Sequence, residues 1–298
     1  MKYAVTGAAG HISNLLVQQL LNAGHKVTVI GRNKDNLHQL VSAGADYALG
    51  SVEDAEFLKK AFEGADAVYT MCPYSYIATD IAGYYEMIGK NYAKAIEANQ
   101  IKYVVNLSSI GAHLSEGAGP ISSLNKVEAE LNSLSDVNIK HLRPSYFYYN
   151  FFGYIDMIKN MGIIGSNFSV PPNRFTVVDT SEVADVAVEE LLDLKFSNHS
   201  VRYITSDETG TDEIAAILGQ AIGKPDLRWV KFTPQQALEG MLQEGLPKEI
   251  AKAFVEMSNA IDSRKIMEDY WLNPPARLGS IKFESFAKEF AKVYQASL

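Results

Sequence analysis

The sequence predicts an α/β protein that is built on a doubly wound parallel sheet and carries a smaller, mainly helical C-terminal cap. Through the first half of the chain, short runs rich in β-branched residues alternate with longer amphipathic stretches, which is typical of strand–helix units in a parallel sheet. The first of these runs leads directly into a turn with two glycines that opens a helix. Together these observations predict a Rossmann-type fold.

Six strands are predicted in the first half from β-branched and aromatic runs. They are Tyr3–Thr6, Lys26–Ile30, Tyr47–Leu49, Ala67–Met71, Tyr103–Leu107 and Ile139–Leu142. Helices are predicted between them, because apolar residues recur three and four positions apart over residues 11–23, 34–43, 54–63, 80–98 and 122–134. In a doubly wound sheet of this kind, the ligand site lies beyond the carboxyl ends of the strands.

The alternating pattern loosens after residue 150. At 298 residues, the chain has room for two modest domains or one elaborated α/β domain. We expect a sheet domain over residues 1–150 and a smaller substrate or cap region over residues 151–298, interleaved with the sheet domain. In this second half Ser181 is predicted to be the N-cap of a helix, a strand is expected at Arg202–Thr205, and further helices are expected near 211–222, 234–244, 247–262 and 282–296.

The composition excludes several classes of protein. Hydrophobic residues make up 47% of the chain and charged residues 21%, which is ordinary for a globular protein. The single cysteine, Cys72, cannot form an internal disulfide, and no leader sequence is recognised, so a reducing cytoplasmic location is expected. No apolar run approaches the roughly 18 residues of a membrane span. The net charge of −8 has the wrong sign for general attraction to nucleic acid.

The turn Thr6–Ser13 has the features of a loop that holds the diphosphate of a dinucleotide. Gly7 permits a tight turn, Gly10 lets the backbone approach a phosphate, and the helix that follows offers free N–H groups and the positive end of its dipole. Ser13 occupies the place of a third glycine and is small enough for close packing of helix against strand. Residues 1–150 are therefore predicted to be an NAD(P)-binding domain, with loop contacts from Gly7, Ala9, Gly10, His11 and Ile12.

The end of the second predicted strand indicates which cofactor is used. A carboxylate at this place binds the adenosine ribose and favours NAD, whereas an arginine accommodates the 2′-phosphate of NADP. The sequence reads Ile30-Gly31-Arg32-Asn33-Lys34, with no acid before Asp35. Arg32 therefore favours NADPH over NAD, and the alternative is that it is a solvated loop charge.

Several further stretches occur in the order typical of one family. They are Asn106–His113, Leu142–Asn150, Asp179–Asp185 and Thr205–Ala215, which follow the Thr6–Ser13 loop. With them the chain resembles the NmrA-like branch of the atypical short-chain dehydrogenases/reductases over about residues 1–225. The resemblance implies an NADPH-dependent reductase of quinones or dyes, or a redox-sensing regulator that binds the cofactor without turning it over.

One departure from the wider superfamily bears on which reactions the site can catalyse. Full members use a Tyr-x-x-x-Lys pair, in which the lysine lowers the pKa of the tyrosine phenol so that it exchanges a proton with the substrate. This chain has Ser122 and Lys126 at the matching places. A serine cannot replace the phenol, which weakens the epimerase, dehydratase and alcohol dehydrogenase interpretations. The interpretation as a reductase of a quinone-like acceptor is unaffected, because the protons can come from water or a less specialised donor.

Residues that follow the predicted strands are candidates for cofactor contacts. Met71, Cys72 and Pro73 end the fourth strand and are expected to line the adenosine side. Ser108 and Ser109 end the fifth strand at the height of the nicotinamide, although serines at strand ends are also common in turns. Nothing near Cys72 in the sequence would activate its thiol.

The candidates for catalysis are Lys126, Tyr146 and His113. Lys126 is expected to touch the ribose or nicotinamide, and its alternative is an exposed helical lysine. Tyr146 belongs to the aromatic stretch Tyr146–Phe152, of which two or three residues are expected to reach the pocket and the rest to pack in the core. His113 could donate a proton, or it could be a surface histidine. The six histidines and one cysteine show no metal-ligand spacing, so no metal is expected.

The leading hypothesis is thus an NADPH-dependent reductase that passes a hydride to a planar conjugated small molecule such as a quinone. The second hypothesis is a non-catalytic NAD(P)-binding sensor that acts on a regulatory protein partner, and a nucleotide-sugar epimerase is third. A homodimer is compatible with each of them, whereas contacts with nucleic acid or membrane are not expected.

Overall fold

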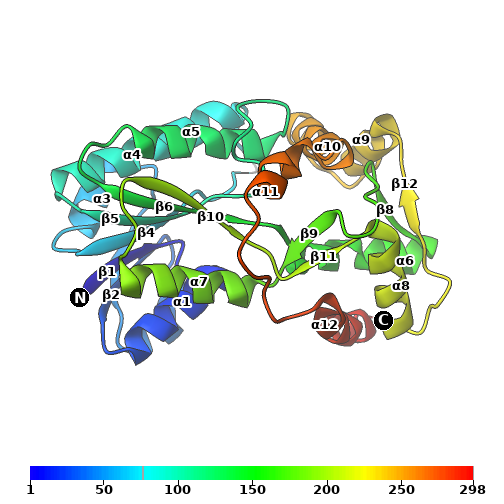
Figure 1. Ribbon diagram of the computed structural model, residues 1–298, viewed down its shortest axis with the longest axis horizontal. Helices are drawn as coiled ribbons and strands as arrows, with labels where there is room; N and C mark the ends of the chain where they lie inside the picture. The colour runs from blue at the N-terminus through cyan, green and yellow to red at the C-terminus, as the bar shows by residue number, and fades with distance from the viewer. Residues whose placement is uncertain (76, 298) are drawn as a thin grey trace.

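The computed structural model describes residues 1–75 and 77–297, and a seven-stranded parallel sheet forms its centre (Figure 1). The strand order is β10-β6-β5-β4-β1-β2-β3. These strands are β1 Lys2–Thr6, β2 Lys26–Gly31, β3 Asp46–Leu49, β4 Ala67–Met71, β5 Tyr103–Leu107, β6 Asn138–Pro144 and β10 His199–Ile204. The predicted Rossmann-type α/β fold is confirmed. The strand predicted at Arg202–Thr205 starts earlier and forms the edge of this same sheet.

The sheet reverses its order at its first strand. β1 pairs with β2 on one side and with β4 on the other, so the chain winds outward from β1 in both directions. The carboxyl ends of β1 and β4 therefore border a crevice that no connection crosses, which is the topological switch point where ligands bind in sheets of this type. Thr6 ends β1 and Met71 ends β4 at this point.

Helices cover both faces of the sheet because successive side chains of each strand point to opposite faces. Tyr3 and Val5 pack with α1 and α7 on one face, whereas Ala4 and Val68 pack with α3, α4 and α5 on the other. Figure 1 shows these two layers on either side of the strands. The helices of these two layers, together with the short α2, are α1 His11–Asn22, α2 His38–Ser42, α3 Ala55–Ala61, α4 Ile81–Ala98, α5 Pro120–Asn132 and α7 Thr180–Asp193.

The second half adds helices and two small sheets around a separate aromatic core. The sheets have the orders β11-β9-β7 and β12-β8. The strands are β7 Tyr146–Phe147, β8 Ile164–Ser166, β9 Phe175–Val178, β11 Asp207–Thr209 and β12 Trp229–Lys231. The helices are α6 Ile155–Met161, α8 Thr211–Ala221, α9 Pro234–Gln243, α10 Lys248–Asp262, α11 Glu268–Leu272 and α12 Phe283–Ala296.

Three local predictions need correction. Ser181 is not the N-cap of α7, because the carboxylate of Asp179 takes that role and accepts hydrogen bonds from the Ser181 backbone N–H at 2.8 Å and hydroxyl at 2.6 Å. The helix predicted over 34–43 is a 3₁₀ turn at Asp35–Leu37 followed by the short α2. The small strands of the second half were not predicted, since runs of two to four residues carry no readable periodicity.

None of the described helices is long and apolar enough to cross a membrane. Among the same residues, no group of three or more His, Cys, Asp or Glu side chains is arranged to hold a metal ion.

Candidate functional site

The turn between β1 and α1 lies at the switch point of the sheet. Gly7 has a φ of +62°, and a Cβ at this position would lie 2.6 Å from Sδ of Met71. Gly10 is the N-cap of α1 and has no side chain to bond the first N–H groups of the helix. Its own N–H donates to the Gly7 carbonyl at 2.9 Å, which closes the turn. The first N–H groups of α1 therefore remain available to an anionic group.

A cavity of about 430 Å³ opens beside this turn. Its walls come from the residues that follow four strands of the sheet, which meet at one edge because the strands are parallel. Of the predicted cofactor contacts, the structure places Gly7, Ala9, Gly10, Arg32, Met71 and Pro73 in this wall. The size and the backbone-rich wall next to the open end of α1 suit a nucleotide with its phosphates.

Arg32 is the cation among the residues that line this first cavity. It forms no salt bridge with any residue in the described part of the chain. The neighbouring Lys34 instead places its Nζ 4.9 Å from the centre of the Tyr47 ring and does not line the cavity. Arg32 is thus the side chain that can meet a phosphate at this wall.

The loop after β3 also supplies residues to this wall, although the lack of an acid at Gly50-Ser51-Val52 had put a contact with the adenine in doubt. Ser51, Val52 and Glu53 line the first cavity. The side-chain amide of Asn91 on α4 holds this loop by donating to the Val52 carbonyl at 3.2 Å and the Glu53 carbonyl at 2.8 Å. No motif signals this contact, because Asn91 lies far from the loop in the sequence and reaches it only through the packing of α4.

A second cavity of about 340 Å³ lies next to the first, and Met71 lines both. Its walls combine the ends of β4 and β5, the aromatic stretch, and residues from the last fifty of the chain. The predicted site residues in this wall are Met71, Cys72, Ser108, Ser109 and Tyr146. The C-terminal contributors Met257, Ile261, Ile266 and Met267 were not predicted. No charged side chain stands among the described residues that line it.

The aromatic stretch divides between this cavity and the core. Three of its seven residues, Tyr146, Phe147 and Asn150, line the cavity. Burial raises the pKa of the Tyr146 phenol well above its ordinary value, and its ring packs 5.2 Å from that of Phe175. Burial likewise raises the pKa of the Cys72 thiol. Neither group is therefore acidic enough to give up its proton at neutral pH.

Several predicted site residues lie outside both cavities. Lys126 points from α5 toward α4, where its Nζ is 3.2 Å from Oε2 of Glu86. His113 lies in the turn after β5. Burial lowers the pKa of its imidazole, although Asp269 and Glu268 on α11 oppose this shift. His11 packs its ring 4.5 Å from that of Tyr149. Ile12 is buried in the core beneath α1. The roles of these four residues remain predictions.

A buried ion pair between Arg143 and Glu128 lies next to the second cavity and contacts its wall through Ser108. The hydroxyl of Ser108 donates to Oε1 of Glu128 at 2.5 Å. Arg143 donates to both carboxylate oxygens of Glu128, at 3.0 and 2.6 Å, and to Asp269 at 3.0 Å. Tyr203 completes the cluster by donating to Asp269. Because the Ser108 O–H donates to Glu128, the lone pairs of the Ser108 oxygen are left for a ligand that donates a hydrogen bond.

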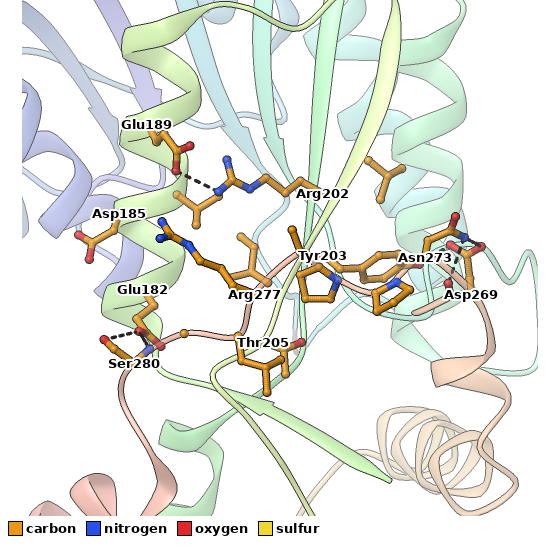
Figure 2. A pocket seen from close by; sticks show the side chains of 18 residues that line it. Glu182, Asp185, Glu189, Arg202, Tyr203, Thr205, Asp269, Asn273, Arg277 and Ser280 are labelled. Atoms are coloured by element: carbon orange, nitrogen blue, oxygen red, sulfur yellow. Dashed lines mark hydrogen bonds and ion pairs between the residues drawn. The ribbon is translucent and has the colours of Figure 1, made fainter. Parts of the chain in front are cut away.

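Another large cavity lies away from the switch point. It measures about 1120 Å³ and borders β10 and the segment between α11 and α12. Figure 2 shows Arg202 paired with Glu189 on one wall and Ser280 bonded to Glu182 on another, with contacts of 2.9 and 3.0 Å. Its polar groups largely bind one another, and no strand end at the switch point reaches it. We therefore place the functional site at the two cavities that share Met71.

The fold and the place of this site at the switch point of the sheet define an α/β protein of the Rossmann class. The model of the NmrA-like family matches residues 2–295, so the chain belongs to the NmrA-like family.

Individual relatives resemble the chain along nearly its whole length. It is 23% identical to the NAD(P)H azoreductase of Xenophilus azovorans, over 98% of this chain and 99% of that one. The solved triphenylmethane reductase of a Citrobacter species, in complex with NADP(H), has a TM-score of 0.78 and 20% identity over 97% and 99% of the two chains. The NADPH-dependent quinone oxidoreductase of Escherichia coli has a TM-score of 0.77 and 16% identity over 99% of each. These structural likenesses support the fold.

Proposed function

We propose that this protein is an NADPH-dependent reductase that transfers a hydride to a planar conjugated acceptor such as a quinone. The observation that carries the proposal is the pair of neighbouring cavities that share Met71 as a lining residue. One offers the Gly7–Gly10 turn and the Arg32 guanidinium, and the other offers apolar and aromatic walls. This is the arrangement that a charged dinucleotide and a flat apolar substrate need when they must meet. The relatives named as azoreductase, dye reductase and quinone oxidoreductase support the same chemistry.

The residues of the first cavity fit the cofactor. A side chain at Gly7 would collide with Met71, so the glycine keeps the backbone clear where a diphosphate would lie against it. The N–H groups at the start of α1 hold the phosphate charge, and Arg32 holds the 2′-phosphate. Ser108 accepts a hydrogen bond at the inner end of the crevice. When bound, the reduced nicotinamide supplies the hydride.

The residues of the second cavity favour a flat acceptor. Tyr146 and Phe147 provide ring surfaces on which such an acceptor can pack, and Met257 and Ile261 from α10 add apolar surface to the wall. With no charged side chain in its described wall, the cavity offers no obvious acid, so the proton that accompanies the hydride comes from water. This arrangement suits quinone reduction, which needs no base at an alcohol carbon.

The test of this proposal is turnover. We expect the purified protein to oxidise NADPH in the presence of a subset of quinones, measured as the loss of absorbance of the reduced nicotinamide. Tight NADPH binding without oxidation by any member of a broad panel of quinones and dyes would contradict the reductase and favour the sensor.

Arg32→Glu tests the cofactor preference. The variant loses a charge-assisted contact to the 2′-phosphate and adds a repulsive charge, so we expect the ratio of NADPH to NADH affinity to fall by roughly 10- to 100-fold. Affinities measured by fluorescence titration check this. Lys34→Glu is the matched control, because Lys34 carries the same charge on the same loop but does not line the cavity. An unchanged ratio of NADPH to NADH affinity in Arg32→Glu would show that Arg32 does not contact the 2′-phosphate.

A further inference from the structure

One polar atom in the second cavity has no partner. Thr176 lies in β9, and the residue is fully buried. Its hydroxyl oxygen is enclosed and makes no hydrogen bond within the described part of the chain. Its neighbours Phe175 and Val177 belong to the aromatic core, and both Phe175 and Thr176 line the second cavity. A hydroxyl left in this state destabilises the free protein, because burial has removed its water without supplying a substitute.

Two other buried hydroxyls at this cavity are already paired. Ser108 donates to Glu128 at 2.5 Å, and Ser145 shares a hydrogen bond of 2.6 Å with Thr205. Ser109 and Asn150 also line the cavity, but both are partly exposed and can be hydrated. Thr176 is therefore a fully buried hydroxyl of this wall that has no partner in the described part of the chain and can donate to a bound molecule.

We propose that Thr176 donates a hydrogen bond to a carbonyl oxygen of the acceptor, and that it selects neutral carbonyl-bearing rings over cationic dyes. This inference rests on the proposed function. The walls hold many apolar groups and, in their described part, no carboxylate that could neutralise a buried cation. A carbonyl oxygen fits the free hydroxyl, because it accepts and never competes as a donor.

The hydrogen bond strengthens during the reaction. The quinone gains one hydride from the reduced nicotinamide and one proton from water, so it leaves as a hydroquinone and the nicotinamide leaves oxidised. Negative charge builds on the carbonyl oxygen before that proton arrives. Thr176 keeps its own proton but holds it against this oxygen, and hydrogen bonds to charged acceptors are about twice as strong as those to neutral ones.

Thr176→Val and Thr176→Ser separate this role from simple packing. Valine matches the shape of threonine without the hydroxyl, so we expect kcat/KM for menadione to fall roughly tenfold or more, and the preference for menadione over the cationic dye crystal violet to fall with it. The melting temperature of the unliganded Val variant should rise, because an unpaired hydroxyl has been removed. Thr176→Ser should retain menadione turnover.

Thr211→Val is the matched control for stability. Thr211 is equally buried, but its hydroxyl contacts the N–H of Val170 at 3.2 Å and the carbonyl of the same residue at 3.3 Å. Its loss should lower the melting temperature, opposite to the effect at Thr176. Equal menadione kinetics in wild type and Thr176→Val, or a lower melting temperature for Thr176→Val, would overturn the inference.

A binding measurement keeps the inference separate from the proposed function. Calorimetric titration with menadione alone, without any nicotinamide, should show weaker binding to Thr176→Val than to wild type. If wild type binds menadione in this way but never oxidises NADPH, the reductase proposal fails while the role of Thr176 stands. If turnover occurs but menadione binds both proteins equally, the role of Thr176 fails.

Discussion

Replacing Glu128 by alanine is expected to lower the free energy of unfolding by about 3–5 kcal/mol, because it leaves the Arg143 guanidinium buried without its main partner. The side chains of Arg143 and Glu128 are only 8% and 6% exposed, so water cannot take the place of the lost carboxylate. Burial by itself lowers the pKa of Arg143. The hydrogen bonds and the negative charge of Glu128 outweigh this effect, so the pKa of Arg143 is raised. Urea denaturation followed by circular dichroism checks the prediction.

The control for this variant is Glu130→Ala on the same helix. Glu130 is partly exposed and lies on the side of α5 that faces α4, with its carboxylate 3.9 Å from Lys90, and its loss should change the stability by no more than about 1 kcal/mol. Glu128→Gln should fall between the two, since its amide oxygen can still accept one hydrogen bond from Arg143. Similar stabilities for Glu128→Ala and Glu130→Ala would show that the buried cluster does not hold β6 and α5 together.

Acidification from pH 7 to pH 4 is expected to remove about 3 kcal/mol of stability through one side chain, His141. Burial lowers the pKa of this imidazole from 6.5 to about 4. Its surroundings fix the neutral form: Asn132 Oδ1 lies 2.9 Å from Nε2, which must donate, and the Asn106 amide lies 3.1 Å from Nδ1, which must accept. Thr70 donates to the oxygen of the same amide at 2.9 Å and so sets its orientation.

The sign follows from proton binding. Between pH 6.5 and 4 the unfolded chain protonates His141 while the folded chain does not, so each pH unit of acidification favours unfolding by about 1.4 kcal/mol. Above pH 6.5 both states are neutral and the contribution of His141 is constant. The contribution of His141 to the free energy of unfolding is therefore fully present at neutral pH. It is lost as the pH falls toward the pKa of His141 in the folded state.

His141→Gln isolates this contribution, because other groups titrate alike in both proteins. The difference in unfolding free energy between wild type and variant, measured by urea titration at several pH values, should shrink by about 3 kcal/mol from pH 7 to pH 4. A difference that stays constant over this range would show that His141 titrates normally in the folded state.

The sequence sufficed for the parts of the site that are local in the chain. The Gly7–Gly10 turn lies directly between a strand and a helix, and Arg32 directly follows the next strand, so order along the sequence already placed them at the switch point. Met71 and Ser108 follow from the same rule, since parallel strands end at one edge of the sheet.

The remainder of the site depends on contacts between distant segments. Thr176 reaches the cavity on a four-residue strand that pairs with β7 on one side and β11 on the other. Met267 comes from the segment before α11. Lys126 was predicted to face the cofactor, yet the structure shows it pairing with Glu86, which lies 40 positions earlier. No local pattern encodes such pairings, because they arise only when the helices pack.

The central claim is that the Gly7–Gly10 turn and Arg32 hold a phosphorylated nicotinamide dinucleotide. Isothermal titration calorimetry of the purified protein with NADPH and, separately, NADH tests it most directly. We predict that one NADPH binds per chain, at least tenfold more tightly than NADH, as expected when a single charged contact is added. No heat of binding with either nucleotide would contradict the claim, and equal affinities would remove the role of Arg32.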